Sequence, residues 1–178
     1  MENFLYIVYM AKYQSLNGFD LVKMYGGSNP PNIWTYKDIH NKSIDKLLGQ
    51  TGKCIILFLN SENYGHWCAL YRNRYGINFF DSYGNKPDSQ YDFIPQGMAK
   101  SLNGYIRELT SKLYGEKLKG IPVHYNDYRL QDWDDKDIAT CGRWCVVRLQ
   151  YPEISVKDFG EIFLDRSLRP DDIVVELT

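Results

Sequence analysis

Three separated segments of the chain carry side chains whose types suit nucleophilic catalysis. His66 follows Gly65 at the start of one apolar segment, Asp81 ends a second, and Cys141 stands immediately before Gly142 at the start of a third. A cysteine near a histidine is the minimum for a thiol nucleophile with a general base, and a carboxylate can orient that base. These residues predict a catalytic cysteine if the fold brings the three segments together.

Cys141 differs from the other three cysteines in its position. It begins an expected helix, and the free N–H groups and partial positive charge of a helix N-terminus stabilise a thiolate. Cys54, Cys68 and Cys145 lie inside apolar segments and are expected to be small core residues. The spacing from Cys54 to Cys68 is too wide for a zinc pair, and Cys141 and Cys145 have no second pair, so we expect neither a metal nor another cofactor.

The pairing of His66 with Asp81 follows from strand alternation. Residues 66–72 and 76–82 are expected to form a hairpin, and a two-residue loop at 73–74 places His66 directly opposite Asp81. A three-residue loop moves the direct partner to Ser82 and leaves Asp81 as a diagonal neighbour. The hairpin alone is explained as well by a half-buried polar pair in a sheet, and Cys141 is what favours catalysis.

The elements that must position these residues form an α+β domain, with a small central, mostly antiparallel sheet flanked by helices. Residues 54–59 are a short apolar run typical of a strand buried on both faces. We expect further strands at 66–72, 76–82 and 121–125, a last extended piece at 173–177, and helices at 35–48, 96–113, 140–150 and 155–164.

Composition limits the function classes. A chain of 178 residues predicts one domain over 1–178, and 44% hydrophobic residues exclude a disordered chain. The net charge of −1 argues against a dedicated nucleic-acid or anionic-membrane binder. The apolar run 4–10 is too short to span a bilayer, and Glu2 replaces the basic start of a signal peptide, so secretion is not expected and thiols should be reduced.

The order of the candidate residues narrows the family. Papain-type enzymes place the cysteine first, whereas here His66 and Asp81 precede Cys141. The chain resembles the adenovirus-type and SUMO-protease-type cysteine peptidases, and is most similar to the maturation proteases of virophages, Polinton-like elements and large DNA viruses. The motifs that carry the resemblance, in order, are Gly65-His66-Trp67, Phe79-Phe80-Asp81-Ser82, Leu130-Gln131 and Thr140-Cys141-Gly142-Arg143-Trp144.

The resemblance implies a role for each matched residue. His66 would be the general base, Asp81 its orienting acid and Cys141 the nucleophile. Gln131 would donate from its side-chain amide to the oxyanion, beside the backbone N–H of Cys141. Trp67 would pack beside the catalytic pair.

The same resemblance assigns Trp67 and Gly142 to substrate binding. Two departures from the family pattern stand out in the region before the cysteine. Ten positions separate Gln131 from Cys141, and the intervening 132–137 segment reads as an extended acidic loop. Thr140 also stands where many cellular members have Asp, which points away from cellular SUMO proteases.

The sequence therefore predicts a monomeric cysteine endopeptidase that cleaves viral structural precursors at Gly-containing sites, in the virion or the host cytoplasm. The alternatives are a ubiquitin-like-protein-specific protease acting as an effector and a catalytically inactive binding module. The expected partner is a protein substrate, with an activating peptide or DNA as further candidates and no membrane.

Gly26-Gly27 is either a self-processing site or a flexible turn. Scattered basic residues form either a DNA-facing patch or an ordinary surface: Arg72, Arg74, Arg107, Lys112, Lys117 and Lys119.

Overall fold

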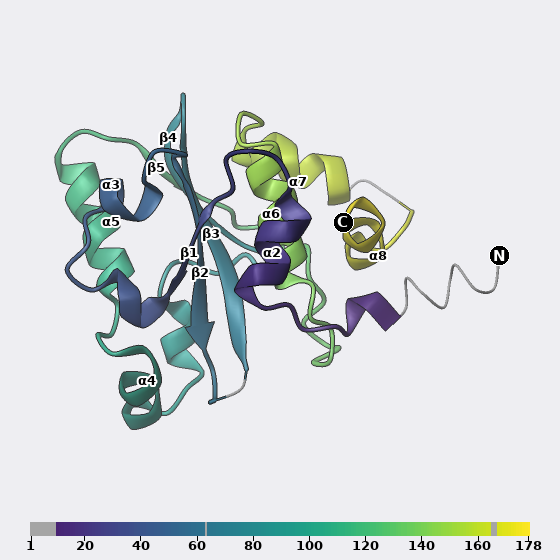
Figure 1. The fold of residues 1–178 in the computed structure, drawn as a ribbon, viewed down its shortest axis with the longest axis horizontal. Helices are drawn as coiled ribbons and strands as arrows, with labels where there is room; N and C mark the ends of the chain where they lie inside the picture. The colour runs from purple at the N-terminus through teal and green to yellow at the C-terminus, as the bar shows by residue number, and fades with distance from the viewer. Residues whose placement is uncertain (1–9, 63, 165–166) are drawn as a thin grey trace.

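A five-stranded sheet forms the middle layer of the structure, a computed structural model that describes residues 10–62, 64–164 and 167–178 (Figure 1). Most of the apolar run 4–10 lies outside the described residues. The strands lie in chain order across the sheet: β1 (Asn32–Thr35), β2 (Lys53–Leu59), β3 (Gly65–Asn73), β4 (Gly76–Asp81) and β5 (Val123–Tyr125).

Helices cover both faces of this sheet, as the α+β prediction requires (Figure 1). One face carries α2 (Gly18–Tyr25), α6 (Cys141–Gln150), α7 (Val156–Leu164) and α8 (Pro170–Leu177). The other carries η1 (Tyr36–Ile39), α3 (Ile44–Leu48), α4 (Gln96–Asn103) and α5 (Glu108–Leu118), with η2 (Ser89–Asp92) in a connecting loop. Strand β2 is apolar on both sides because Ile55 packs into one core and Cys54, Ile56 and Phe58 into the other.

The sheet is mixed, which corrects the prediction of a mostly antiparallel one. The inner pairs β2–β3 and β3–β4 are antiparallel, but β1 runs parallel to β2 and β5 runs parallel to β4. The parallel edges arise because helical segments separate β1 from β2 and β4 from β5 along the chain, and parallel neighbours need such long crossovers.

The predicted register of the β3–β4 hairpin is wrong by two residues. The turn falls at 74–75, so that Asn73 pairs with Gly76 and Asp81 lies opposite Cys68. The Asn73 side chain fixes this turn by accepting a hydrogen bond of 2.9 Å from the N–H of Tyr75. A shift of two keeps every side chain on its face, so His66 still shares a face with Asp81 as its diagonal neighbour.

The expected helix at 35–48 is also wrong. Residues 32–35 form strand β1, and the capping box of Thr35 and Asp38 starts only the single turn of η1. Asn41 then adopts a positive φ of 59°, which ends the helical path, and Ser43 caps the separate helix α3.

Two further predictions fail at helix ends. The expected helix at 96–113 is two helices, because Gly104 with a φ of 79° ends α4. The expected extended piece at 173–177 belongs to α8, which begins with Pro170 at its first turn and has Asp171 and Asp172 beside the positive helix end. The helices predicted at 140–150 and 155–164 are confirmed, with Ser155 capping α7 through the N–H of Asp158.

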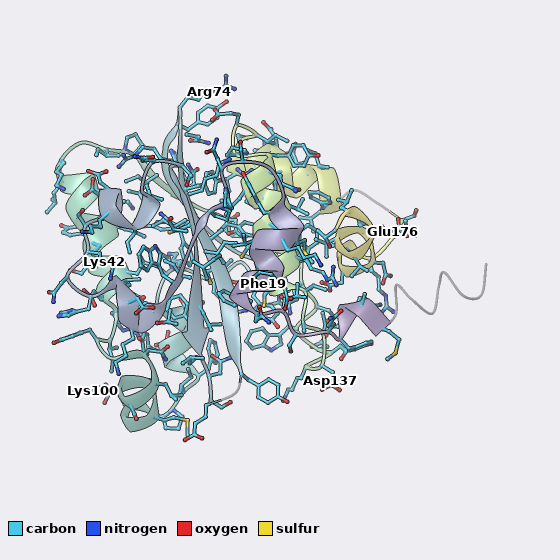
Figure 2. The ribbon with its side chains drawn as sticks, in the orientation of Figure 1. Phe19, Lys42, Arg74, Lys100, Asp137 and Glu176 are labelled. Atoms are coloured by element: carbon cyan, nitrogen blue, oxygen red, sulfur yellow. The ribbon has the colours of Figure 1, made fainter. Side chains whose placement is uncertain are left out.

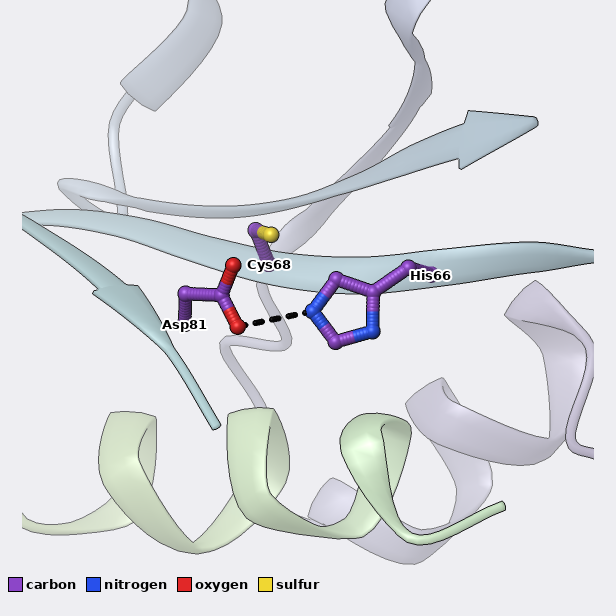
Figure 3. Close-up of side chains that lie close together, drawn as sticks. All are labelled: His66, Cys68 and Asp81. Carbon is purple, nitrogen blue, oxygen red and sulfur yellow. Dashed lines mark hydrogen bonds and ion pairs between the residues drawn. The ribbon is translucent and has the colours of Figure 1, made fainter. Parts of the chain in front are cut away.

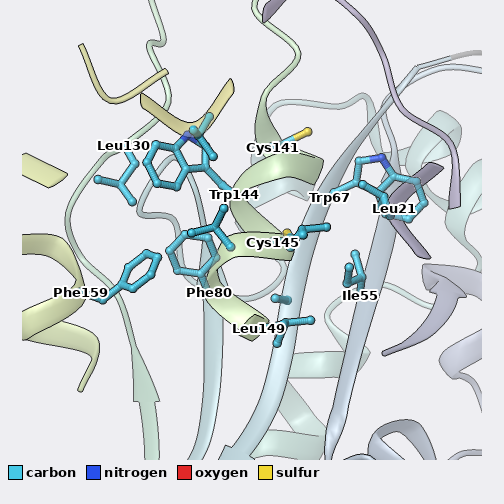
Figure 4. Packing of buried hydrophobic residues seen from close by; sticks show 14 of the residues in the cluster. Leu21, Ile55, Trp67, Phe80, Leu130, Cys141, Trp144, Cys145, Leu149 and Phe159 are labelled. Carbon is cyan, nitrogen blue, oxygen red and sulfur yellow. The ribbon is translucent and has the colours of Figure 1, made fainter. Parts of the chain in front are cut away.

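Helix α6 is buried from Cys141 to Leu149, and Cys141, Trp144, Cys145 and Leu149 lie in the core on this side of the sheet (Figure 4). An internal arginine fixes its C-terminal end. The Arg148 side chain is fully buried and donates to the carbonyl oxygens of Tyr151 and Ile154, both at 2.6 Å. Its guanidinium also lies 4.7 Å from the ring centre of Tyr71 and 4.5 Å from that of Phe159. Among the described residues, no helix is long and apolar enough to cross a bilayer.

We predict that Arg148→Ala lowers the free energy of unfolding by about 3–5 kcal/mol, because it leaves a large cavity and removes the donor from two carbonyls. Urea unfolding at neutral pH measures this loss. Arg74→Ala is the matched control, since Arg74 projects from the tip of the β3–β4 hairpin (Figure 2) and should change stability by less than about 0.5 kcal/mol. Equal losses for both variants would show that Arg148 does not anchor α6.

Candidate active site

A short polar contact joins β3 to the end of β4 (Figure 3). Nε2 of His66 lies 2.8 Å from Oδ1 of Asp81, and both side chains are buried. Gly65 permits the close approach of β2 at this point, since a Cβ there would lie 2.5 Å from the carbonyl oxygen of Phe58. The glycine of the Gly-His-Trp motif thus has a packing reason to precede the histidine.

The Asp81 carboxylate is satisfied on both oxygens. Oδ1 also accepts a hydrogen bond from the backbone N–H of Tyr83 at 2.8 Å, and Oδ2 accepts from Nε2 of Gln90 at 2.9 Å. The Asn126 amide holds the backbone of Asp81, accepting from its N–H at 2.9 Å and donating to its carbonyl at 2.7 Å. A carboxylate with this many donors is held in one orientation.

This environment controls the protonation of His66. Burial alone lowers the pKa of the imidazole, but the charge of Asp81, the neighbouring Cys68 and the hydrogen bond with Asp81 together outweigh burial, and the pKa lies well above its usual value. A hydrogen bond with Cys141 acts in the same direction. Since Nε2 is engaged by Asp81, Nδ1 is the ring nitrogen left for the thiol. Tyr83 stacks on the imidazole with ring centres 4.9 Å apart and keeps the ring in this plane.

Cys141 begins α6, and its side chain lies at the edge of the core between Trp67 and Trp144 (Figure 4). The thiols of Cys54, Cys68 and Cys145 are fully buried, and burial raises the pKa of each, for Cys68 to about 12. These three therefore stay protonated and unreactive, as expected for core residues. Cys141 is the cysteine that combines a helix N-terminus with a neighbouring imidazole.

Trp67 and Gly142 pack beneath the nucleophile. A Cβ on Gly142 would lie 2.7 Å from Cδ2 of Leu21 and 3.2 Å from Cδ1 of Trp67, so the glycine lets α2 and the indole contact the first turn of α6. The Trp67 N–H donates to the carbonyl of Leu16 at 3.0 Å. Trp67 is thus beside the candidate catalytic residues, as expected, but in this structure it belongs to the core, and its role in substrate binding stays a prediction.

Gln131 is buried next to the same group. Its Nε2 donates to the Tyr83 hydroxyl and to the Ile138 carbonyl, both at 2.9 Å, and its Oε1 accepts from the Ser82 hydroxyl at 2.8 Å. Both amide hydrogens are therefore engaged by the protein. To donate to an oxyanion, Gln131 must exchange one of these partners for substrate, and this role stays a prediction.

The long segment between Gln131 and Cys141 is tied at its base by Asp171 of α8. One oxygen of this buried carboxylate accepts from the backbone N–H of Asp132 at 2.8 Å, and the other accepts from the hydroxyl of Thr140. Burial raises the pKa of Asp171, while these donors oppose the rise. Asp171 therefore sets the position of the residue that precedes the nucleophile.

His66, Cys68 and Asp81 also have the composition of a metal site. Their ligand atoms lie within 4.8 Å of one another. Hydrogen bonds from His66, Tyr83 and Gln90 occupy the Asp81 carboxylate, however, so a metal would have to displace these donors before the carboxylate could bind it. The geometry therefore favours a hydrogen-bonded imidazole–carboxylate pair.

A cleft of about 420 Å³ opens beside His66. Its lining includes Tyr83 and Gln90 from the candidate site, Phe93 and Ile94 from the loop before α4, and Trp133 from the segment that follows Gln131. A ligand that enters this cleft would therefore contact the imidazole of His66.

Sequence reasoning missed several of these residues. The sequence indicates Tyr83 only by its position two residues after Asp81. No motif or hydrophobic pattern around Gln90 or Asp171 indicates a place in the site. Asn126 holds the backbone of Asp81 from both sides of its side-chain amide. Its two amide hydrogens go to the carbonyls of Asp81 and Tyr128.

The scattered basic residues lie beside acidic side chains or an aromatic ring. Arg72 pairs with Asp45 at 2.6 Å and Lys119 with Glu116 at 2.7 Å. Lys117 lies over the Tyr125 ring. The other three also pair with acidic side chains: Arg74–Glu153, Arg107–Asp92 and Lys112–Glu108. Gly26 and Gly27, with φ of 66° and 74°, form the turn that ends α2.

Comparison with known proteins identifies a virophage relative. No protein-family model matches the chain. The chain is similar to the "Uncharacterized protein V9" of Sputnik virophage, with 36% identity over 172 residues that cover 92% of this chain and 94% of the relative.

We predict that Asp81→Asn reverses the pH dependence of stability. In the wild type, the raised pKa of His66 gives stability that is complete below about pH 6.5 and is lost as pH rises through the folded-state pKa. In Asp81→Asn, burial dominates and lowers that pKa, so stability falls as pH drops below about 6.5. Unfolding free energies from urea titrations between about pH 5 and 8 measure this difference. Parallel curves for the two proteins would contradict the pairing.

Proposed function

The chain belongs to the virophage protein family that includes V9 of Sputnik virophage, and from this premise and the geometry of the site we propose that it is a cysteine endopeptidase. The observation that carries the proposal is the His66–Asp81 contact of 2.8 Å, with Cys141 at the start of α6 close enough to the same imidazole to raise its pKa. A buried carboxylate, an imidazole and a helix-start thiol have complementary roles in acyl transfer.

The proposed reaction proceeds in two steps. The Cys141 thiolate attacks the scissile carbonyl carbon, and His66 gives its proton to the leaving amine as the C–N bond breaks. His66 then takes a proton from water, which attacks the thioester and releases Cys141. Asp81 keeps Nδ1 of the imidazole directed at the reacting atoms throughout both steps.

The oxyanion formed in each step needs donors. The backbone N–H groups at the start of α6 precede the first helical hydrogen bond, from Trp144 to Thr140, and have no carbonyl within the helix. The Gln131 amide lies in the same region and is held by Tyr83, the ring that stacks on His66. We assign Gln131 and the N–H of Cys141 to this role.

The substrate we propose is a virus structural precursor, cleaved at a Gly-containing site in the virion or the host cytoplasm. The virophage relative supports a viral setting, and the resemblance to maturation proteases supports the substrate class. A protease for ubiquitin-like proteins remains the second candidate. Incubation with ubiquitin- and SUMO-vinyl sulfone separates the two, because covalent labelling of Cys141 by either probe would favour the second.

We predict that Cys141→Ala abolishes cleavage of the capsid protein encoded by the same virus, with thermal stability nearly unchanged. The reason is that the thiol is the only group proposed to bond to substrate, and a small side chain replaces it. Electrophoresis and mass mapping of the products follow the reaction. Cys145→Ala, one turn further along the helix, is the matched control and should still cleave. Activity in Cys141→Ala together with its loss in Cys68→Ala or Cys54→Ala would overturn the assignment.

We predict that Gln131→Met lowers kcat by about 10²–10³ with little change in KM, because a donor to the oxyanion acts on the transition state. Steady-state kinetics on a Gly-containing peptide test this, with thermal melting to confirm that the variant is folded. If Gln131 only joins Ser82 to the following loop, the variant loses stability while the folded fraction keeps wild-type kcat.

A further inference from the structure

A row of aromatic rings leads outward from the candidate catalytic imidazole. Tyr83 stacks on His66, Trp133 meets the edge of Tyr83 with ring centres 4.9 Å apart, and Phe93 lies 5.6 Å from Trp133. All four side chains line the cleft of about 420 Å³. Trp133 is 40% exposed and Phe93 is 65% exposed, so both present ring surface to a ligand.

These exposed rings are held in place. Trp133 follows Asp132, whose N–H is fixed by the buried Asp171 carboxylate, and the Arg129 guanidinium lies 5.8 Å from the centre of the indole. Ile94 and Pro95 continue the apolar wall beyond Phe93. A fixed wall of this kind loses little conformational freedom when an apolar side chain binds to it.

The position of the cleft relative to His66 and Cys141 indicates which residue of a peptide substrate the cleft would bind. His66 lines it, whereas Cys141 is not among the described residues that do. In the proposed reaction Cys141 holds the acyl part, and His66 gives a proton to the leaving amine. The residue that carries this amine therefore lies on the His66 side.

We propose that the cleft formed by Tyr83, Phe93, Ile94 and Trp133 binds a large apolar side chain on the residue immediately after the scissile bond. This inference rests on the proposed function and adds a specificity to it. The lining includes one charged side chain besides His66, that of Lys136, and its other polar groups are the Tyr83 hydroxyl, the Trp133 N–H and side-chain amides. A leucine or phenylalanine therefore suits the cleft better than a charged residue. Trp133 is the main specificity-determining residue because its indole bridges the other two rings.

Partitioning of an acyl-enzyme tests this site directly. The phenyl thioester of acetyl-Gly-Gly is added to the protein, the Cys141 thiolate attacks its carbonyl carbon, and thiophenolate leaves. Leucinamide and glycinamide then compete at equal concentration. The amine nitrogen of either one attacks the acyl-enzyme, His66 takes the proton from that nitrogen, the C–S bond breaks and Cys141 is released. Mass spectrometry compares the two amide products, corrected for the same mixture with Cys141→Ala.

We expect the leucinamide product to exceed the glycinamide product about tenfold, a typical discrimination for an apolar pocket. Trp133→Ala should reduce the ratio to about twofold, and Trp133→Phe should largely restore it. Tyr114→Ala is the matched control, because Tyr114 is an exposed aromatic residue of α5 that does not line the cleft, and the ratio should be that of the wild type.

The outcomes separate the two proposals. Acylation of Cys141 with equal products, or a ratio that Trp133→Ala leaves unchanged, overturns the apolar site and leaves the endopeptidase proposal standing. If mass spectrometry of the intact protein detects no acyl-enzyme at Cys141, the endopeptidase proposal is overturned. The proposed substrate specificity is then overturned as well.

Discussion

The buried charge of Asp81 is the constraint on which the rest of the site depends. Burying an ionised carboxylate costs several kcal/mol unless hydrogen-bond donors surround it. The fold must therefore position donors around Asp81. Donors come from β3, from the turn after β4 and from η2, through His66, Tyr83 and Gln90. The Asn126 amide holds the backbone of the same residue. The charge that results keeps His66 protonated and oriented, which is the state that a neighbouring thiolate needs.

The second requirement is that the first turn of α6 lies against the sheet. Gly142 meets this requirement by leaving room for Leu21 and Trp67, while Asp171 ties Thr140 from the side and Arg148 fixes the far end of the helix. Contacts from α2, near the N-terminal end of the described chain, and from α8, at its C-terminal end, therefore position the candidate nucleophile. The segment between Gln131 and Cys141, held by Asp171, serves a further purpose by carrying Trp133 to the cleft.

Local sequence pattern predicted the strands and helices that carry the candidate residues, because β2, β3, β4 and α6 have strong hydrophobic patterns of their own. The contact of His66 with Asp81 was predicted with a register that is wrong by two residues, and it survived because side chains alternate with a period of two. Elements decided by one residue in the left-handed region, such as the break at Asn41, were missed. Gln90 and Asp171 could not be found, because tertiary packing, which no local sequence pattern indicates, brings them to Asp81 and Thr140.

The central claim is that His66, charged by Asp81, activates Cys141. The most direct measurement is the rate at which iodoacetamide alkylates each cysteine of the folded protein at neutral pH, mapped by mass spectrometry, in the wild type and in His66→Gln, which retains an amide donor for Asp81. The account predicts that Cys141 reacts far faster than Cys54, Cys68 and Cys145, and that His66→Gln slows this reaction while melting at a similar temperature. Alkylation of Cys141 at the same rate in both proteins would contradict it.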